Sequence, residues 1–287
     1  MTLLTRFILS LLLVLVSAST ALGQLVAAKD GPIVYGHHHV SAANVDEEKK
    51  FFVAALGGVL LKVGTGNTEI VKFPNVFIWF RAQAPSGGSR GTTVNHVGFS
   101  VPDLRPVVER IKANGFQMIT STEAPTNRVV KDDIAGAPPE GGNALAFALT
   151  PGGTKVELVE IKTQALPMTL HHVHFFGQQN LDMRAWYIKV FGAVERNGGP
   201  FPAADLPGVA LNFSPSPDPV VGTQGRAIDH IGFEIRNLLE FTQRLQAMGI
   251  TLERPYTKVE ALGTVIAYVR DPWGTYIELT EGLDKFN

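Results

Sequence analysis

Four segments of the chain share one order of hydrophobic and polar positions. Each begins with a short apolar strand that starts at a histidine, carries a polar residue seven positions later, continues as a helix and ends at glycine. The starting histidines are His39, His96, His172 and His230. A pattern that returns four times predicts four copies of one structural unit.

The boundaries of the expected helices have local physical causes. Asp and Asn side chains accept hydrogen bonds from the free N–H groups of a first helical turn, and glycine tolerates the left-handed conformation that ends many helices. The polar starts are Asp46, Asp103, Gln179 with Asn180, and Asn237, and the stops are Gly57, Gly115, Gly192 and Gly249. Short β-rich runs follow at 76–80, 144–149, 155–161, 209–213, 264–269 and 275–280. Each unit is therefore predicted to be a strand, a helix and about three further strands.

The spacing of the histidines suggests how the units pair. His96 follows His39 by 57 positions and His230 follows His172 by 58, whereas 76 positions separate His96 from His172. The loops inside each close pair are rich in Gly, Pro and Ser. We therefore expect one domain over residues 33–163 and a second over residues 169–283.

Composition removes several classes of function. With 287 residues, 45% of them hydrophobic and 18% charged, the chain has the make-up of ordinary globular domains. A net charge of −1 gives no electrostatic case for nucleic acid or an anionic membrane surface. The chain has no cysteine, which excludes disulfides, thiolate metal sites and cysteine nucleophiles.

The N-terminus has the features of a secretory signal peptide. Arg6 precedes an apolar run over residues 7–16, and small residues at Ala21 and Gly23 suit a signal peptidase. We expect residues 1–23 to be removed before Gln24, so that the mature chain is periplasmic or secreted. The alternative is a retained anchor, although the run is short for a ~20-residue membrane span.

All eight histidines fall at the four strand starts. Because side chains alternate between the two faces of a strand, His39, His96, His172 and His230 are predicted to occupy equivalent positions on one face of their sheets. The other four are weaker candidates. His38 and His171 should face the opposite way, His37 should end its strand, and His174 shares the face of His172.

The last strand of each expected domain adds a carboxylate. Glu157 lies between Val156 and Leu158 in KVELVE, and Glu278 lies between Ile277 and Leu279 in YIELTE. Alternation sends these glutamates to the concave face, where a buried carboxylate needs a positive or hydrogen-bonding partner. Two imidazoles and one carboxylate suit a divalent metal such as iron, manganese, zinc or nickel. A purely structural hydrogen-bonded arrangement is the alternative.

These motifs resemble the vicinal-oxygen-chelate superfamily, which includes glyoxalase I, extradiol dioxygenases and bleomycin-resistance proteins. The resemblance rests on the strand-start histidines with their helices and on DPWGTYIELTEG over residues 271–282. It implies an α+β fold of four βαβββ modules paired into two half-open barrel domains. It assigns His172, His230 and Glu278 to a metal site of the second domain, and His39, His96 and Glu157 to one of the first. Because some members build each site from modules of different domains, His39 could instead join His230 and Glu278.

The resemblance also implies an enzyme that chelates two adjacent oxygens of a small organic substrate. Tyr268 matches a tyrosine of the extradiol dioxygenases, which favours ring cleavage. Those enzymes also carry an acid–base histidine shortly before that tyrosine; this chain has none there, and His174 is the candidate to replace it. Trp79 and Asn212 stand where glyoxalase-type lyases and isomerases carry a fourth ligand, a glutamate, which disfavours that alternative. Phe147 replaces Tyr268 in the first domain, so the second is expected to be catalytic.

The third possibility is a ligand-sequestering module without catalysis, against which two complete triads argue. Arg184, Tyr187 and Arg254 could line a pocket, although solvated positions suit them better. The expected partner is a small molecule rather than nucleic acid or a membrane, and a homodimer is left open.

Overall fold

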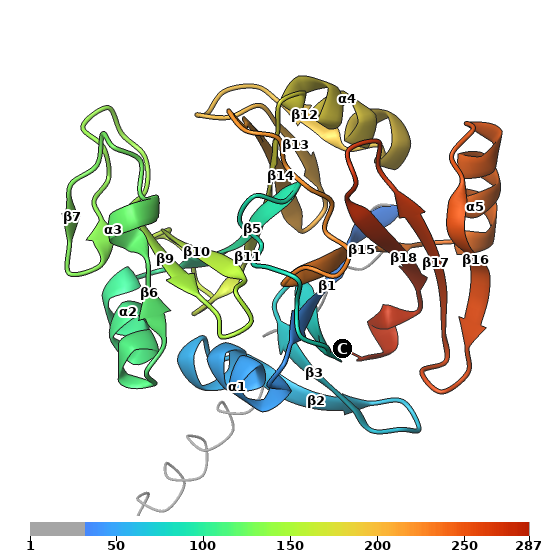
Figure 1. Cartoon of the computed structure of the whole chain (residues 1–287), viewed down its shortest axis with the longest axis horizontal. Coiled ribbons are helices and arrows are strands. Elements are labelled where there is room, and N and C mark those ends of the chain that lie inside the picture. The colour runs from blue at the N-terminus through green and yellow to red at the C-terminus, as the bar shows by residue number, and fades with distance from the viewer. Residues whose placement is uncertain (1–31, 287) are drawn as a thin grey trace, which may run out of the picture.

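The structure is a computed structural model that describes residues 32–286. The expected signal peptide, residues 1–23, lies outside these residues. The four modules that the sequence predicts are confirmed, each with a leading strand, a helix and following strands (Figure 1). No helix in the described range is long and apolar enough to cross a membrane.

The first two modules span the N-terminal half. The first consists of β1 Ile33–Ala42, α1 Val45–Lys50, the π-helix η1 Phe51–Ala55, β2 Val59–Val63, β3 Thr68–Phe73 and β4 Val76–Ala82. The second consists of β5 Val94–Val101, α2 Leu104–Ala113, β6 Gln117–Met118, α3 Thr120–Glu123, β7 Val130–Lys131, β8 Ile134–Ala135, β9 Leu145–Leu149 and β10 Lys155–Glu160. The small elements α3, β7 and β8 are an insertion before the last two strands of the second module.

The other two modules complete the chain. The third consists of β11 Thr169–Gly177, α4 Asn180–Phe191, β12 Val194–Arg196, β13 Ala203–Leu206 and β14 Val209–Pro215. The fourth consists of β15 Ile228–Ile235, α5 Leu238–Ala247, β16 Leu252–Val259, β17 Thr264–Arg270 and β18 Tyr276–Glu281. A short 3-10 helix, η2 Leu283–Phe286, follows.

The modules do not pair in the expected order. One sheet runs β16-β17-β18-β15-β1-β4-β3-β2 and so joins the first module to the fourth. The other runs β12-β13-β14-β11-β5-β10-β9-β8-β7, with β6 beside β9, and joins the second module to the third. The division into 33–163 and 169–283 is therefore wrong for the sheets, because each half of the chain contributes one module to each of them.

The two Gly/Pro/Ser-rich loops explain this exchange. Instead of turning back within one sheet, loops 83–93 and 216–227 cross between the sheets side by side. Their backbones hydrogen-bond to each other, from Ser86 N to Gly225 O at 2.8 Å and from Thr93 N to Val221 O at 2.9 Å. These bonds satisfy backbone groups that a free crossover would expose.

Each sheet is built around a central antiparallel pair of leading strands. In one sheet β1 pairs with β15, placing His39 opposite His230, and in the other β5 pairs with β11, placing His96 opposite His174. The closing strands β18 and β10 run parallel to β15 and β5. Histidines and closing carboxylates from distant parts of the sequence thereby share one face of each sheet.

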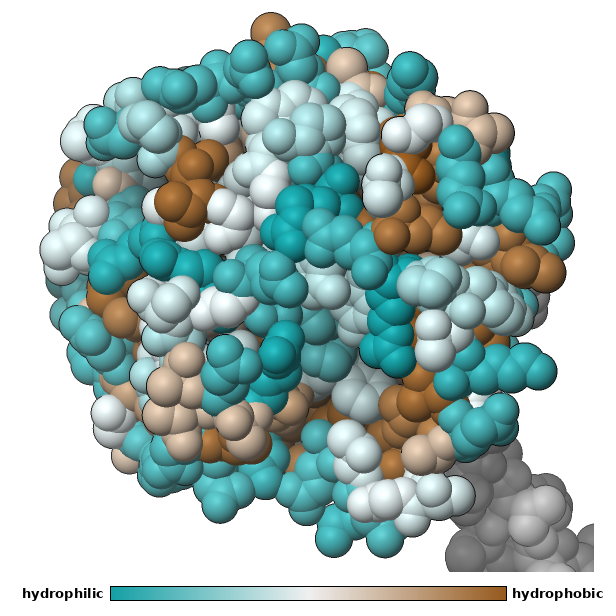
Figure 2. Space-filling model, turned by 45° about the vertical axis from the view of Figure 1, so that its right-hand side comes forward, coloured by the Kyte–Doolittle hydropathy of each residue, from teal (hydrophilic) through white to brown (hydrophobic). Residues whose placement is uncertain are grey.

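The opposite faces of the two sheets pack under the helices. Alternate residues of the leading strands, such as Val97, Phe99, Ile231 and Phe233, are fully buried in one continuous hydrophobic core. Helices α1, α2, α4 and α5 lie on the outside in Figure 1. The face shown in Figure 2 is largely hydrophilic, with hydrophobic residues in separate patches.

The helix starts agree in part with the sequence. Asp103 caps α2 by accepting a hydrogen bond from Arg105 N, and Asn237 caps α5 by accepting one from Glu240 N. The cap of α1 is Asn44 rather than Asp46, and Gln179 gives α4 no side-chain cap. Asn44 lies just before the first helical turn, where its side-chain oxygen reaches the N–H groups of Asp46 and Glu47.

Candidate metal centres

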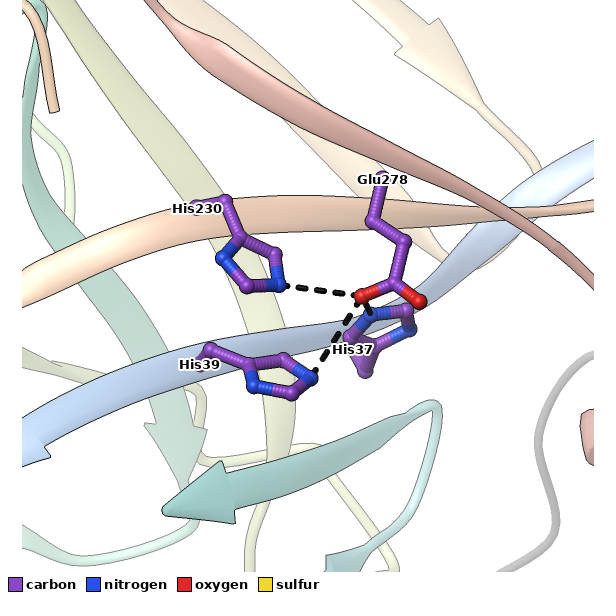
Figure 3. Close-up of side chains that lie close together, drawn as sticks. All are labelled: His37, His39, His230 and Glu278. Carbon is purple, nitrogen blue, oxygen red and sulfur yellow. Dashed lines mark hydrogen bonds and ion pairs between the residues drawn. The ribbon is translucent and has the colours of Figure 1, made fainter. Parts of the chain in front are cut away.

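Four side chains converge on one face of the sheet formed by the first and fourth modules (Figure 3). We name the group of His37, His39, His230 and Glu278 cluster A. His37 and His39 come from β1, His230 from β15 and Glu278 from β18. One potential ligand atom of each lies within 4.8 Å of the others.

The three imidazoles of cluster A converge on a single oxygen. Glu278 Oε2 lies 3.1 Å from His37 Nε2, 3.5 Å from His39 Nε2 and 3.0 Å from His230 Nε2. A carboxylate oxygen has two lone pairs, so it cannot serve three N–H donors equally well. Ligands about 2.1 Å from a shared cation lie about 3.0–3.4 Å apart, which matches these separations. The donor set therefore fits a divalent metal ion better than a hydrogen-bonded group.

A glycine makes room for one of these imidazoles. Gly232 of β15 lies opposite His37, and a Cβ at this position would overlap the His37 ring. Gly98 of β5 lies opposite His172 in the other sheet, and a Cβ there would overlap that ring in the same way. The glycines in HIGF and HVGF thus permit a histidine of the neighbouring strand to lie across the sheet surface.

A buried carboxylate supports His230 from behind. Asp229 Oδ1 lies 2.6 Å from His230 Nδ1 and accepts a hydrogen bond of 2.7 Å from Arg81 Nη1. The Gly225 N–H donates to Asp229 Oδ2 at 2.7 Å. With Nδ1 engaged in this way, Nε2 of His230 faces Glu278 and the centre of the cluster.

Two of the four side chains of cluster A are held in the protonation states that bind a cation. Burial raises the pKa of Glu278, but the neighbouring His37 charge and the hydrogen bonds from His230 and His37 outweigh it and hold that pKa well below its usual range. Burial, with the His230 charge, lowers the pKa of His39 well below its ordinary value. The glutamate is therefore ionised and His39 neutral at physiological pH, the forms in which both residues bind metals.

Tyr268 borders cluster A. It lies opposite Glu278 in the β17–β18 register, and its ring centroid is 5.4 Å from that of His230. Burial and the Glu278 charge raise the pKa of Tyr268 above its ordinary value, so its hydroxyl stays protonated. The side chain is half-buried and adjoins the metal-ligand candidates.

A second group occupies the corresponding place in the other sheet. We name His96, Glu157, His172 and His174 cluster B, and all four are buried. Glu157 Oε2 lies 2.8 Å from His96 Nε2 and 3.3 Å from His172 Nε2, and His174 Nδ1 lies 3.1 Å from His96 Nε2. His174 directs its other nitrogen to Ser214 Oγ at 2.8 Å. These distances also fit four donors around one cation.

The surroundings of cluster B are more apolar. Phe147 lies opposite Glu157, in the place that Tyr268 has beside Glu278, and packs with Ile119, Leu145 and Val159. Burial lowers the pKa of His96 to about 4, so this imidazole is neutral at physiological pH. The expected difference between Phe147 and Tyr268 thus places a hydroxyl beside cluster A and an apolar ring beside cluster B.

The structure corrects the expected grouping of the candidate ligands. His39 lies with His230 and Glu278, the exchanged arrangement, while His172 lies with His96 and Glu157. The within-domain triads are wrong because the crossing loops exchange the modules between the sheets.

Two histidines have a different place from the one expected. His37, expected at the end of its strand, is part of cluster A, and His174, expected as an acid–base residue, is a potential ligand of cluster B. Both belong to His-x-His pairs, His37 with His39 and His172 with His174. Recognising the shared spacing would have aligned His37 with His172 and His39 with His174.

The remaining candidates lie outside the clusters. His38 faces the core, where its Nδ1 is 3.4 Å from the Tyr35 hydroxyl, and His171 lies beside His172 without joining cluster B. Tyr187 is fully buried and donates to Asp271, while Arg184 pairs with Glu195. Arg254 is exposed and lies opposite Tyr268.

Trp79 and Asn212 occupy equivalent positions, as expected. Trp79 lies opposite His39 and stacks on it with ring centroids 5.5 Å apart, and Asn212 lies opposite His174. An indole has no lone pair for a metal, so all the donors of cluster A come from β1, β15 and β18.

Comparison with known proteins agrees with this architecture. The model of the family described as "Glyoxalase/Bleomycin resistance protein/Dioxygenase superfamily" matches residues 169–279. No curated protein sequence matches the chain.

Two solved structures illustrate the likeness of fold. Glyoxalase I from Zea mays is similar at 17% identity and a TM-score of 0.66, with 88% of this chain and 94% of that chain covered. The "putative dioxygenase" from Bacillus subtilis subsp. subtilis str. 168 is similar at 14% identity and a TM-score of 0.59, covering 86% and 84%. Both likenesses extend over nearly all of the described modules. The resemblance to the glyoxalase/bleomycin resistance protein/dioxygenase superfamily is thus supported by the family model over residues 169–279, and the fold of the described residues is similar to that of glyoxalase I.

Proposed function

We propose that the protein is a metal-dependent enzyme that acts at cluster A on a small organic substrate with two adjacent oxygens. The observation that carries the proposal is the convergence of three imidazole nitrogens on Glu278 Oε2, within 3.5 Å, beside a protonated tyrosine. His37, His39, His230 and Glu278 would hold iron, manganese, zinc or nickel, all of which accept imidazole and carboxylate donors. The metal would act as a Lewis acid that polarises the bound substrate oxygens.

Tyr268 would donate a hydrogen bond to a substrate oxygen that becomes negative during the reaction. Its hydroxyl is kept protonated by burial and by the Glu278 charge, and its ring is held by stacking on Tyr276 at 4.9 Å between centroids. A donor fixed before the reaction stabilises developing charge without having to reorganise. Phe147 offers no such donor at cluster B, which supports cluster A as the reactive site.

The number of donors favours an isomerase or lyase of the glyoxalase type. If all four side chains of cluster A bind, a metal with about six positions keeps two of them, enough for two adjacent substrate oxygens. The fold likeness to glyoxalase I agrees with this class.

A ring-cleaving dioxygenase is the second candidate. It is favoured by the position of Tyr268 directly opposite Glu278 on the neighbouring strand. It also needs a place for O₂ besides the two substrate oxygens, so one of the four donors would have to stay unbound. His39, whose side chain is 18% exposed and whose nitrogen is farthest from Glu278 Oε2, is the natural one.

A non-catalytic module that sequesters a ligand remains the alternative outside enzymology. Such a module has no need of four convergent donors, and it gives no role to a protonated tyrosine at their edge.

We further propose cluster B as a second metal site, held by His96, His172, His174 and Glu157. Each cluster is complete within one chain, so neither proposal requires a partner subunit.

Two measurements test the proposal. Metal analysis of the purified protein should find bound divalent metal, and Glu278→Gln should lose it from cluster A. Assays with α-hydroxycarbonyl compounds and catechols, in air and under nitrogen, should then show turnover of a hydroxycarbonyl substrate that does not depend on oxygen. Oxygen uptake with a catechol would select the dioxygenase instead. Metal-free protein with no turnover in either assay would contradict both enzyme classes.

A further inference from the structure

The two clusters are alike in their donors but differ in what lies behind one histidine. The residue before the β15 histidine of cluster A is Asp229, and the residue before the β5 histidine of cluster B is Asn95. Asp229 Oδ1 lies 2.6 Å from His230 Nδ1, and Asn95 Oδ1 lies 2.9 Å from His96 Nδ1. The same ring nitrogen therefore meets a carboxylate in one cluster and a neutral amide in the other.

Asp229 is fixed as an ionised group. Only 1% of it is exposed, and besides His230 it binds the Arg81 guanidinium and the Gly225 N–H, each at 2.7 Å. Arg81 comes from β4 of the first module, so this contact also holds the two modules of the sheet together. A buried carboxylate with three such partners keeps its charge and its orientation.

Asn95 has no corresponding charge. It is 9% exposed, and its backbone oxygen accepts a hydrogen bond from Ser89 Oγ at 2.8 Å. Lys155, the first residue of the neighbouring strand β10, is already paired: its Nζ lies 2.6 Å from Glu123 and over the Phe147 ring. Both histidines have a glutamate on the Nε2 side, but behind Nδ1 His96 has a neutral amide, whereas His230 has an ionised carboxylate.

A carboxylate that accepts the second N–H of a metal-binding histidine makes the other nitrogen a stronger donor. Removing such a partner typically weakens metal binding by ~10–100-fold. Asn95 can fix the same tautomer as Asp229, but it adds no negative charge to the imidazole. The geometry points to two metal sites of unequal strength, in which cluster A fills first and Asp229, held by Arg81, is the positioning residue responsible. This inference rests on the proposed metal binding and adds the order in which the two sites fill.

The opposing interpretation is that Asp229 only stabilises the fold through its buried pair with Arg81. The chain offers a reciprocal pair of variants that separates the two. Asp229→Asn gives cluster A the support that cluster B has, and Asn95→Asp does the reverse. Each replacement changes one atom and preserves the side-chain shape.

The experiment titrates the full chain, freed of metal, with zinc(II) against a chromophoric chelator. The wild type should bind two zinc ions in separate steps, and His172→Ala, which removes a donor of cluster B, should abolish or weaken only the second step. Asp229→Asn should weaken the first step by ~10–100-fold, and Asn95→Asp should strengthen the second by about tenfold or more. Unfolding temperatures of the metal-free variants report any purely structural effect.

The outcomes are distinct. If the wild type takes up no zinc, the proposed metal sites themselves fail. If two ions bind with equal affinity, or if Asp229→Asn lowers the unfolding temperature and leaves the first step unchanged, the unequal filling is overturned. Should Asp229→Asn fail to fold, Asn95→Asp decides, because an unchanged second step would contradict the role assigned to the carboxylate.

Discussion

His39 of β1 and His230 of β15 stack face to face with ring centroids 4.0 Å apart. They lie directly opposite each other in the antiparallel register, although they come from the first and the fourth module. This contact means that cluster A cannot form within either half of the chain.

The first prediction follows from this pairing. His39→Ala should weaken metal binding at cluster A and strongly reduce activity, because it removes one of four donors and the ring that stacks on His230. His172→Ala should spare both, because His172 lies in cluster B. Turnover of the two variants and the first step of a zinc titration, measured side by side, provide the test, because His172→Ala should change only the second step. If His172→Ala abolished activity and His39→Ala spared it, His172 would instead belong with His230 and Glu278.

The local pattern was sufficient to predict the four modules and most of the ligand candidates. Strand alternation places Glu157 and Glu278 on the concave face, and it correctly associates each with strand-start histidines. The pairing of the modules cannot be read from that pattern, because β1 and β15 lie far apart in the sequence and nothing in either strand alone specifies its partner. The equivalence of His37 and His172 was missed because the first helix was expected to start at Asp46, seven positions after His39, whereas its cap is Asn44, seven positions after His37.

The second prediction concerns stability and pH. Glu234 is 4% exposed and accepts hydrogen bonds from Gly282 N at 2.7 Å and Leu283 N at 3.1 Å, which anchor η2. Burial raises the pKa of Glu234 to about 8 from an ordinary value of 4.5. The folded state therefore holds a proton that the unfolded chain releases. The stability due to this proton is complete below about pH 4.5 and is lost as the pH rises through about 8.

Glu234→Gln cannot ionise and keeps an acceptor for both backbone N–H groups. Between roughly pH 5 and pH 8 the free energy of unfolding should therefore fall less for the variant than for the wild type. One such group lowers it by at most about 1.4 kcal/mol per pH unit. Urea unfolding at a series of pH values measures the difference, with the exposed Glu109→Gln as the control. Identical slopes for Glu234→Gln and the wild type would show that Glu234 ionises normally.

The third prediction concerns the N-terminus. We propose that export removes residues 1–23 and that the mature protein begins at Gln24, because Ala21 and Gly23 are the small residues before that position. Mass spectrometry of protein recovered from the periplasm or medium should show this start. A chain that keeps its first 23 residues after export would refute the cleavage.

The fourth prediction isolates the chemistry of Tyr268 from metal binding. Its hydroxyl borders cluster A but is not among the four donors, so Tyr268→Phe should leave metal content unchanged. Loss of a hydrogen bond to a developing negative charge should still reduce turnover by ~10²–10³-fold. Phe147→Tyr at the equivalent position of cluster B is the matched control, and it should not change turnover at cluster A. If Tyr268→Phe turned over substrate at the wild-type rate, Tyr268 would have no part in the reaction. If the variant lost its metal, the effect of Tyr268 would run through Glu278, which lies opposite it, rather than through the substrate.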